Sequence, residues 1–231
     1  MIGIIGAMAE EVEAIKELMV IKNVEVHQNY RYHLGTIDDY EVVVVQGGIG
    51  KVNATISTTL LLTNYDVEFV INIGSAGGLK DNQEVGDVVI SKNVVHHDVD
   101  VTAFGRELGQ IPELPTYFEA DEELLNKVED ILKKKKINSH IGLIASGDQF
   151  VSKKEQVDTI ISHFPNAMCC EMEAASVAQT CYVFHKRFII TRSLSDVFNK
   201  GDSSIQFDEY LKKASASSAQ MCLELIRSIK Q

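Results

Sequence analysis

The 231-residue chain is poor in several residue types, and each shortage narrows what it can be. It has no tryptophan, three prolines and four cysteines, none of them in CxxC spacing. Such cysteines are typical of free buried thiols rather than of a disulfide framework or a zinc site. No apolar run approaches the ~20 residues of a membrane helix, and the N-terminus lacks signal-peptide features. We therefore expect a cytoplasmic protein with no membrane contact.

Positive charge is also scarce. The 22 Lys and Arg stand against 33 Asp and Glu, which gives a formal net charge of -11. Proteins that bind nucleic acid need clustered basic residues to meet the phosphates. The one basic run, Lys133–Lys136, falls at the end of a predicted helix and is typical of a solvated surface. The charge balance therefore excludes nucleic acid as a partner and favours a small neutral or cationic ligand.

What the chain does have is a regular alternation of apolar strands and helical patterns. Hydrophobic residues make up 45% of it, enough for a sizeable core. Strands are predicted at 2–5, 41–46, 69–74, 86–91, 140–146 and 187–196, residues 25–48 read as a hairpin-like pair, and 75–80 read as a loop. Helices are predicted near 10–18, 48–65, 121–136, 153–164, 174–184 and 207–230. We predict one α/β domain over residues 1–231, with a central mixed twisted sheet and helices on both faces.

Polar residues follow most of the predicted strands. In open α/β sheets ligands bind beyond the carboxyl ends of the strands. The segments that qualify are 8–11, 47–50, 75–78, 146–150, 171–173 and 192–196. If they converge, they bring together three or four carboxylates, one arginine, several small residues and one aromatic ring. The sequence thus predicts a polar ligand site on one side of the sheet.

Two of these acids lie in a nearly apolar stretch, CCEMEAASVAQTC (169–181), where Glu171 and Glu173 are the only charged residues. A carboxylate in such surroundings needs a partner or loses its charge. Their spacing is equally compatible with an exposed strand end and with two acids facing a cavity. The pair Ser195–Asp196 has the same ambiguity, because it could cap a helix or form a proton donor.

Some stretches resemble known motifs without matching them. GGIGKV lacks the first glycine and the hydroxyl residue of a P-loop. IGSAG has Ile73 where a nucleophile elbow needs glycine. HHDVD (96–100) alternates imidazole and carboxylate groups, but neighbours on a strand point to opposite faces. We therefore predict no metal site and no cofactor.

Seven segments, taken in order, resemble one family: IGIIGAMAEEV, GGIGKVNA, INIGSAGGL, DVTAFG, GLIASGDQF, EMEAASVA and RSLSD. They resemble the bacterial 5'-methylthioadenosine/S-adenosylhomocysteine nucleosidases of the nucleoside phosphorylase superfamily, from Gly3 to the helix after Phe207. The resemblance implies a single nucleoside phosphorylase-like domain. It also implies hydrolysis of the N-glycosidic bond of both nucleosides, and of 5'-deoxyadenosine, in methionine salvage and methyl-cycle recycling. The products would be adenine and 5-methylthioribose or S-ribosylhomocysteine.

The same resemblance implies roles for the catalytic residues. Asp196, beside Ser195, would protonate adenine N7 as the bond breaks. Glu11 would activate the attacking water, with Ser75 and Arg192 around that water. Glu173 would accept hydrogen bonds from the ribose hydroxyls. These roles agree with the chemistry, because a departing base needs a proton and an oxocarbenium-like sugar is stabilised by carboxylates.

The resemblance further implies a set of substrate-binding residues. Phe150 would stack on adenine and the Val151 backbone would read the base edge. The others are Met172, with its backbone beside the ribose, Gly77, the supporting Glu171, and Met8, Ile49 and Phe207 around the 5'-alkylthio group. Val101, Phe104 and Pro112 match a loop that completes the pocket of the neighbouring subunit. That match implies a homodimer.

Three alternatives stay open. A purine nucleoside phosphorylase would need cationic donors for phosphate, yet the N-terminal strand and loop carry Glu11 and no arginine. A silent nucleoside-binding protein would be expected to lack one of the catalytic acids. A nucleosidase for another substrate, such as a futalosine-type nucleoside, would differ only in what it accepts.

Overall fold

The middle of the molecule is a mixed β-sheet. A computed structural model describes residues 1–198, 200 and 203–229, and these form an 11-stranded sheet in the order β2-β3-β4-β1-β5-β11-β6-β10-β9-β7-β8. The strands are β1 (Ile2–Gly6), β2 (Val20–His27), β3 (Tyr30–Ile37), β4 (Tyr40–Gln46), β5 (Phe69–Ile73), β6 (Ser75–Gly78), β7 (Val88–His96), β8 (Phe118–Glu119), β9 (Ser139–Ser146), β10 (Ala167–Glu171) and β11 (Arg187–Val197). The parallel neighbours β1 and β5 are buried along their whole length, as expected of strands covered on both faces.

One part of the sheet closes on itself around the long strand β11. Its first residues pair with β5, and its later residues pair with β7 and β6. Because β6 also pairs with β10, β10 with β9 and β9 with β7, these strands form a closed ring. The register between β11 and β6 shifts between Leu194 and Asp196. Irregularities of this kind redirect side chains and are frequent beside active sites.

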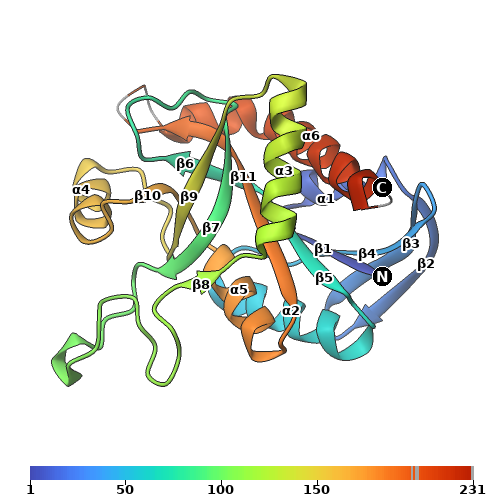
Figure 1. The fold of residues 1–231 in the computed structure, drawn as a ribbon, viewed down its shortest axis with the longest axis horizontal. Helices are drawn as coiled ribbons and strands as arrows, with labels where there is room; N and C mark the ends of the chain where they lie inside the picture. Colours follow the sequence, from blue (N-terminus) through green and yellow to red (C-terminus); the bar gives the residue numbers. More distant parts are fainter. Residues whose placement is uncertain (199, 201–202, 230–231) are drawn as a thin grey trace.

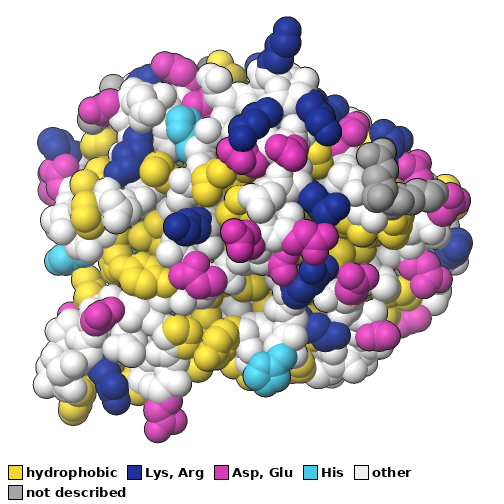
Figure 2. All heavy atoms as spheres, in the orientation of Figure 1, with side chains coloured by type: hydrophobic (Ala, Val, Ile, Leu, Met, Phe, Trp, Pro, Cys, Tyr) yellow, Lys and Arg dark blue, Asp and Glu magenta, His cyan; other side chains and the backbone are white. Residues whose placement is uncertain are grey.

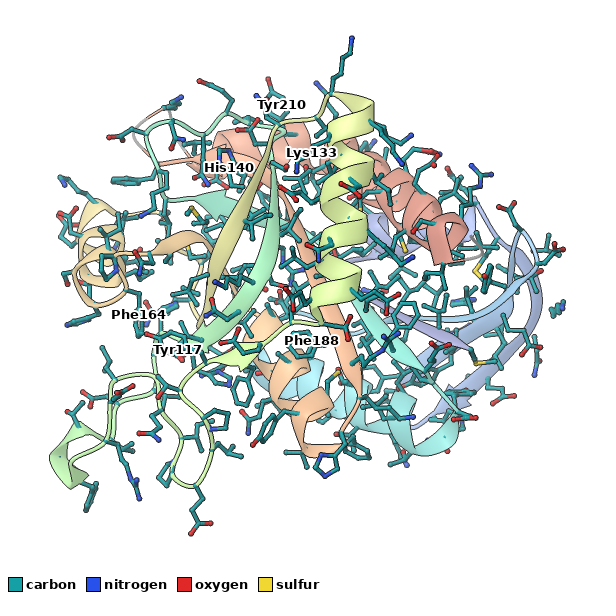
Figure 3. The ribbon with its side chains drawn as sticks, in the orientation of Figure 1. Tyr117, Lys133, His140, Phe164, Phe188 and Tyr210 are labelled. Carbon is teal, nitrogen blue, oxygen red and sulfur yellow. The ribbon has the colours of Figure 1, made fainter. Side chains whose placement is uncertain are left out.

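Helices cover both faces of the sheet (Figure 1). On one face lie α1 (Ala9–Lys16), α3 (Glu122–Lys135) and α6 (Ser203–Ile229), and on the other lie α2 (Lys51–Asn64) and α5 (Ala174–Val183). Neighbouring residues of a strand point to opposite faces. Ile4 therefore joins the core under α1 and α6, whereas Ile5 joins the core under α2 and α5. Phe164, just after α4 (Lys154–His163), packs in a smaller third core with residues of β9 and β10 (Figure 3).

The predicted architecture, a mixed sheet with helices on both faces, is confirmed. Two details of the prediction are wrong. The segment 25–48 belongs to three strands, not two, because a turn with a positive φ of 56° at Gln28 separates β2 from β3. The predicted loop 75–80 begins with strand β6, because Ser75–Gly78 pairs with β10 and β11. Within the described residues, every helix is too short or too polar to cross a membrane.

Candidate active site

A pocket lies where the six predicted polar segments meet. It encloses about 680 Å³ of space, part of which is open to solvent. All six segments contribute to it, so their predicted convergence is confirmed. The residues lining the pocket are Ala7, Met8, Glu11, Ile49, Ile73, Gly74, Ser75, Ala76, Gly77, Gln149, Phe150, Val151, Cys170, Glu171, Met172, Glu173, Ser195, Asp196 and Phe207.

Glu11 reaches the pocket from the first turn of α1. Its side chain folds back over the start of the helix, where Oε2 accepts the N–H groups of Ala7 at 2.8 Å and Met8 at 3.0 Å. The other oxygen, Oε1, accepts the N–H of Ser75 at 3.2 Å. Burial raises the pKa of Glu11, although these N–H groups and the Arg192 charge oppose the rise. A fixed carboxylate with a raised pKa is well suited to accept a proton.

Asp196 enters from the far end of β11, next to the register shift. Its Oδ1 accepts a hydrogen bond of 2.9 Å from the hydroxyl of Ser195, and both residues are buried. Opposite it lies Gly77 of β6, where an added Cβ would be only 3.2 Å from Asp196 Oδ2. Gly74 stands in the same relation to Glu11, with an added Cβ 3.2 Å from Oε1. The two acids therefore border the same short segment, 74–77, at its two ends.

Glu171 is paired with a buried arginine beneath the pocket. Arg192, 1% exposed, places Nη2 at 2.7 Å from Glu171 Oε2 and at 2.7 Å from Asn72 Oδ1. Glu171 also accepts the N–H groups of Glu173 and Ala174 at 3.0 Å and 2.8 Å. One of the two acids in the apolar stretch 169–181 therefore has the cationic partner that a buried carboxylate needs. Removing either member would leave an unpaired buried charge, typically destabilising by about 3–5 kcal/mol.

Arg192 itself lies outside the pocket lining. The resemblance predicted it beside the attacking water, and that role stays a prediction. Its guanidinium pairs with Glu171 and Asn72. An added Cβ at Gly74 would be 3.4 Å from its Cζ and 3.2 Å from Glu11 Oε1, so the guanidinium lies near Glu11. The Arg192 charge opposes the rise in the pKa of Glu11, so it acts on the site through electrostatics.

Glu173 caps the start of α5 and faces the same pocket. Its Oε1 accepts the N–H of Gly50 at 2.9 Å, which joins α5 to the turn before α2. Burial, together with the neighbouring Glu171 charge, raises the pKa of Glu173 to about 8. A ligand that donates hydroxyl groups to this carboxylate would stabilise its charged form.

The raised pKa of Glu173 predicts a pH-dependent stability. Between its ordinary value of 4.5 and about 8, the folded protein holds a proton that the unfolded chain has lost. The contribution of Glu173 to the free energy of unfolding therefore decreases as the pH rises through that window, so the folded protein becomes less stable. Replacing Glu173 with glutamine should remove this fall. Urea unfolding at about pH 5 and about pH 9 gives the free energy of unfolding of each protein. The loss between the two pH values should be smaller in the variant than in the wild type.

Glu17→Gln is the matched control, because it removes an exposed acid just after α1. We expect the control to follow the pH dependence of the wild type. The Glu173→Gln variant should gain stability relative to both as pH rises. The same pH dependence of the unfolding free energy in all three proteins would contradict a raised pKa at Glu173.

Phe150, which is predicted to stack on adenine, forms an aromatic pair. Phe150, in the loop after β9, has its ring centroid 5.8 Å from that of Phe207 at the start of α6, with the rings nearly perpendicular. Met8, Ile49 and Val151 also line the pocket, and their contacts with substrate stay predictions. Sequence reasoning missed Cys170, which lines the wall from β10. No sequence signal marked it, because it directly precedes Glu171 and strand neighbours are expected to point to opposite faces.

The three residues predicted to serve a neighbouring subunit stand apart from this pocket. Val101, Phe104 and Pro112 lie in the long connection between β7 and β8, near the single turn η1 (Thr102–Phe104). Phe104 is 84% exposed. The structure therefore does not bring them to the pocket of their own chain.

No group of metal-binding side chains is gathered in the part of the chain that the structure describes. Within HHDVD, Asp98 binds Lys51 instead, with Oδ1 2.6 Å from Nζ. His96 Nε2 lies 2.9 Å from Gln179 Oε1, an amide oxygen that accepts the hydrogen bond.

Comparison with known proteins places the chain in a family. The profile of the Phosphorylase superfamily matches residues 1–227. A Staphylococcus haemolyticus protein named 5'-methylthioadenosine/S-adenosylhomocysteine nucleosidase is 48% identical over 227 residues, which are 98% of this chain and 99% of that protein. The chain belongs to this nucleosidase family.

Solved structures agree with the family assignment. The nucleosidase of Neisseria meningitidis, in complex with methylthio-immucillin-A, is 40% identical and superposes with a TM-score of 0.94 over 98% of both chains. A futalosine hydrolase of Helicobacter pylori is 34% identical, with a TM-score of 0.92 over 98% of this chain and 97% of that one. The nucleosidase fold therefore serves at least two related hydrolases.

Proposed function

We propose that this member of the nucleosidase family hydrolyses 5'-methylthioadenosine and S-adenosylhomocysteine, and also 5'-deoxyadenosine. The products are adenine and the corresponding sugar, 5-methylthioribose or S-ribosylhomocysteine for the first two, as methionine salvage and methyl-cycle recycling require. The observation that carries the proposal is the placement of Glu11 and Asp196 at the two ends of segment 74–77 in one pocket. Cleavage with attack by water needs a base and an acid on opposite sides of the broken bond.

In the proposed mechanism, Asp196 supplies the proton for the leaving base. As the bond between C1' and N9 breaks, its electron pair moves into adenine, and N7 takes the Asp196 proton. The hydrogen bond from Ser195 to Oδ1 supports this role by fixing the carboxyl group. The sugar becomes an oxocarbenium-like cation, which the acids of the pocket stabilise.

Glu11 completes the reaction by accepting a proton from water. The water oxygen bonds to C1', and the proton that it loses passes to the Glu11 carboxylate. Three backbone N–H groups hold that carboxylate in place, so little rearrangement is needed. Ser75, whose N–H meets Oε1, forms the neighbouring wall. Arg192 assists from behind, through its charge and its pair with Glu171.

The remaining lining residues hold the substrate. Glu173 accepts the ribose hydroxyls, beside the backbone of Met172. Phe150 stacks on adenine, with the Val151 backbone at the base edge and Gly77 leaving room beside Asp196. The apolar residues around the 5'-alkylthio group are Met8, Ile49 and Phe207.

Hydrolysis is favoured over phosphorolysis by the charge of the pocket. Among its described lining residues there is no lysine or arginine, whereas four are acids: Glu11, Glu171, Glu173 and Asp196. A phosphate nucleophile would lack there the cationic donors it requires. On the face drawn in Figure 2, acidic and basic side chains are interspersed without a large basic area.

The proposed enzyme is a homodimer in which each subunit completes the other's pocket. Support comes from apolar residues left exposed beside the pocket rim on α2, Val52 at 68% and Ile56 at 42%, and from the exposed ring of Phe104. Such surfaces are frequent at protein–protein interfaces. The proposed location is the cytoplasm, which fits four free, buried cysteines.

A substrate panel tests the proposed function against the futalosine alternative, which the Helicobacter pylori neighbour makes specific. Base release is measured from 5'-methylthioadenosine, S-adenosylhomocysteine, 5'-deoxyadenosine and futalosine at equal concentrations. We expect kcat/KM for the first two to exceed that for futalosine. A clear preference for futalosine would assign the alternative activity, and no release from any of the four would indicate a silent binding protein.

A further inference from the structure

Lys51, Asp98 and Asp148 form a closed ring of contacts beside the pocket, which we call the rim clasp. Lys51 Nζ lies 2.6 Å from Asp98 Oδ1. The backbone N–H of Asp148 donates to Asp98 Oδ2 at 3.0 Å. The backbone N–H of Lys51 donates to Asp148 Oδ1 at 2.7 Å. Each member of the rim clasp is therefore held by both of the others.

On the α2 side, the rim clasp adjoins the backbone that holds Glu173. Gly50 directly precedes Lys51, and its N–H donates to Glu173 Oε1 at 2.9 Å. Gly50 has a φ of 92°, in the region that favours glycine, and a glycine peptide has more freedom to turn than any other. The direction of this N–H must therefore be fixed by its neighbours. The contacts of Lys51, through its backbone and its side chain, supply that restraint.

Asp98 accepts one hydrogen bond at each of its two carboxylate oxygens, from Lys51 and from the backbone of Asp148. Its side chain and that of Lys51 are each 20% exposed, so the pair is largely shielded from water. Burial raises the pKa of Asp98, but the hydrogen bonds from Lys51 and Asp148 outweigh it and hold the pKa below its usual value. The carboxylate thus accepts from two donors at once. Asparagine keeps one acceptor oxygen and presents donors in place of the other.

We propose that Asp98 is a positioning residue for the hydrolysis, acting through Lys51 and Gly50 on the carboxylate of Glu173. Asp98 lies outside the pocket lining, so it does this without touching the substrate. The inference rests on the proposed function, in which Glu173 orients the ribose. When the clasp is broken, the Gly50 N–H loses its fixed direction and the ribose is less well oriented for attack, which slows the reaction.

The test compares Asp98→Asn with Asp158→Asn. The control also breaks a Lys–Asp pair, Lys154–Asp158 at 2.8 Å, but on the exposed surface of α4. For 5'-methylthioadenosine, we expect Asp98→Asn to lower kcat/KM about ten-fold, the usual weight of one charge-assisted hydrogen bond. Asp158→Asn should leave kcat/KM unchanged. Thermal unfolding of both variants checks folding, and Lys51→Gln replaces Asp98→Asn if that variant does not fold.

A double-mutant cycle then separates positioning from a general structural effect. Asp98→Asn is repeated in a Glu173→Ala background, where Gly50 has no carboxylate to meet. We expect the ten-fold factor to shrink below about two-fold there, because the two residues act along one route. A factor that stays near ten-fold, or an equal loss from Asp158→Asn, would overturn the proposal. A wild-type protein that releases no adenine would instead refute the proposed function, so the two failures are distinguishable.

Discussion

Replacing Asp196 with asparagine should slow adenine release by about 10²–10⁴-fold, the usual contribution of a positioned general acid. Asparagine has nearly the same shape and can still accept the hydrogen bond from Ser195 at Oδ1. It has no acidic proton to give to adenine N7, so the electron pair of the breaking bond is not neutralised. Single-turnover assays with 5'-methylthioadenosine measure the rate, and titration with methylthio-immucillin-A measures whether the pocket still binds.

A second substrate makes this test specific to proton donation. In 7-methylated 5'-methylthioadenosine the base already carries a positive charge and leaves without protonation. The Asp196→Asn variant should therefore cleave it nearly as fast as the wild type does. Equal losses on both substrates would show that the substitution damages the pocket rather than the proton transfer, and unchanged turnover of 5'-methylthioadenosine would remove Asp196 as the acid.

Replacing Glu11 with glutamine should reduce turnover by a similar factor of about 10²–10⁴. The amide oxygen can still accept an N–H of the α1 start, but it cannot take a proton from water. In the wild type, protonation of Glu11 at low pH has the same effect as the substitution. Because burial raises the pKa of Glu11, kcat/KM should fall on the acidic side at a pH above the usual range for a glutamate. That acidic limb should be absent from the residual activity of the variant.

Glu10→Gln is the control for this substitution. Glu10 lies in the same helical turn but is exposed, while Glu11 is 2% exposed. We expect its pH profile and turnover to match the wild type. Retained activity in Glu11→Gln, or an acidic limb that persists in it, would exclude Glu11 as the base.

Much of the site could be predicted from the sequence because chain topology decides which loops meet. Apolar strands followed by polar residues were enough to bring Glu11, Glu173 and Asp196 to one pocket. The resemblance to the nucleosidases added the roles, which the residues alone left ambiguous. The pairing of Glu171 with Arg192 followed only from the structure, since the two lie on different strands and an acid near a helix start has several possible partners.

Other features could not be predicted for physical reasons. Segment 75–78 is rich in glycine and small residues, which favour loops, yet tertiary pairing with β10 and β11 makes it a strand. The closed ring of strands depends on the length of β11, whose later residues pair with new neighbours. The rim clasp joins positions 51, 98 and 148, and no local pattern in a single sequence links residues so far apart.

The most direct test of the whole account is product analysis with 5'-methylthioadenosine, in phosphate-free buffer and again with added phosphate. The acidic pocket and the base role of Glu11 predict adenine and free 5-methylthioribose at the same rate in both buffers. A requirement for phosphate, with a sugar 1-phosphate as the product, would contradict hydrolysis and assign the chain to the phosphorylases of its superfamily.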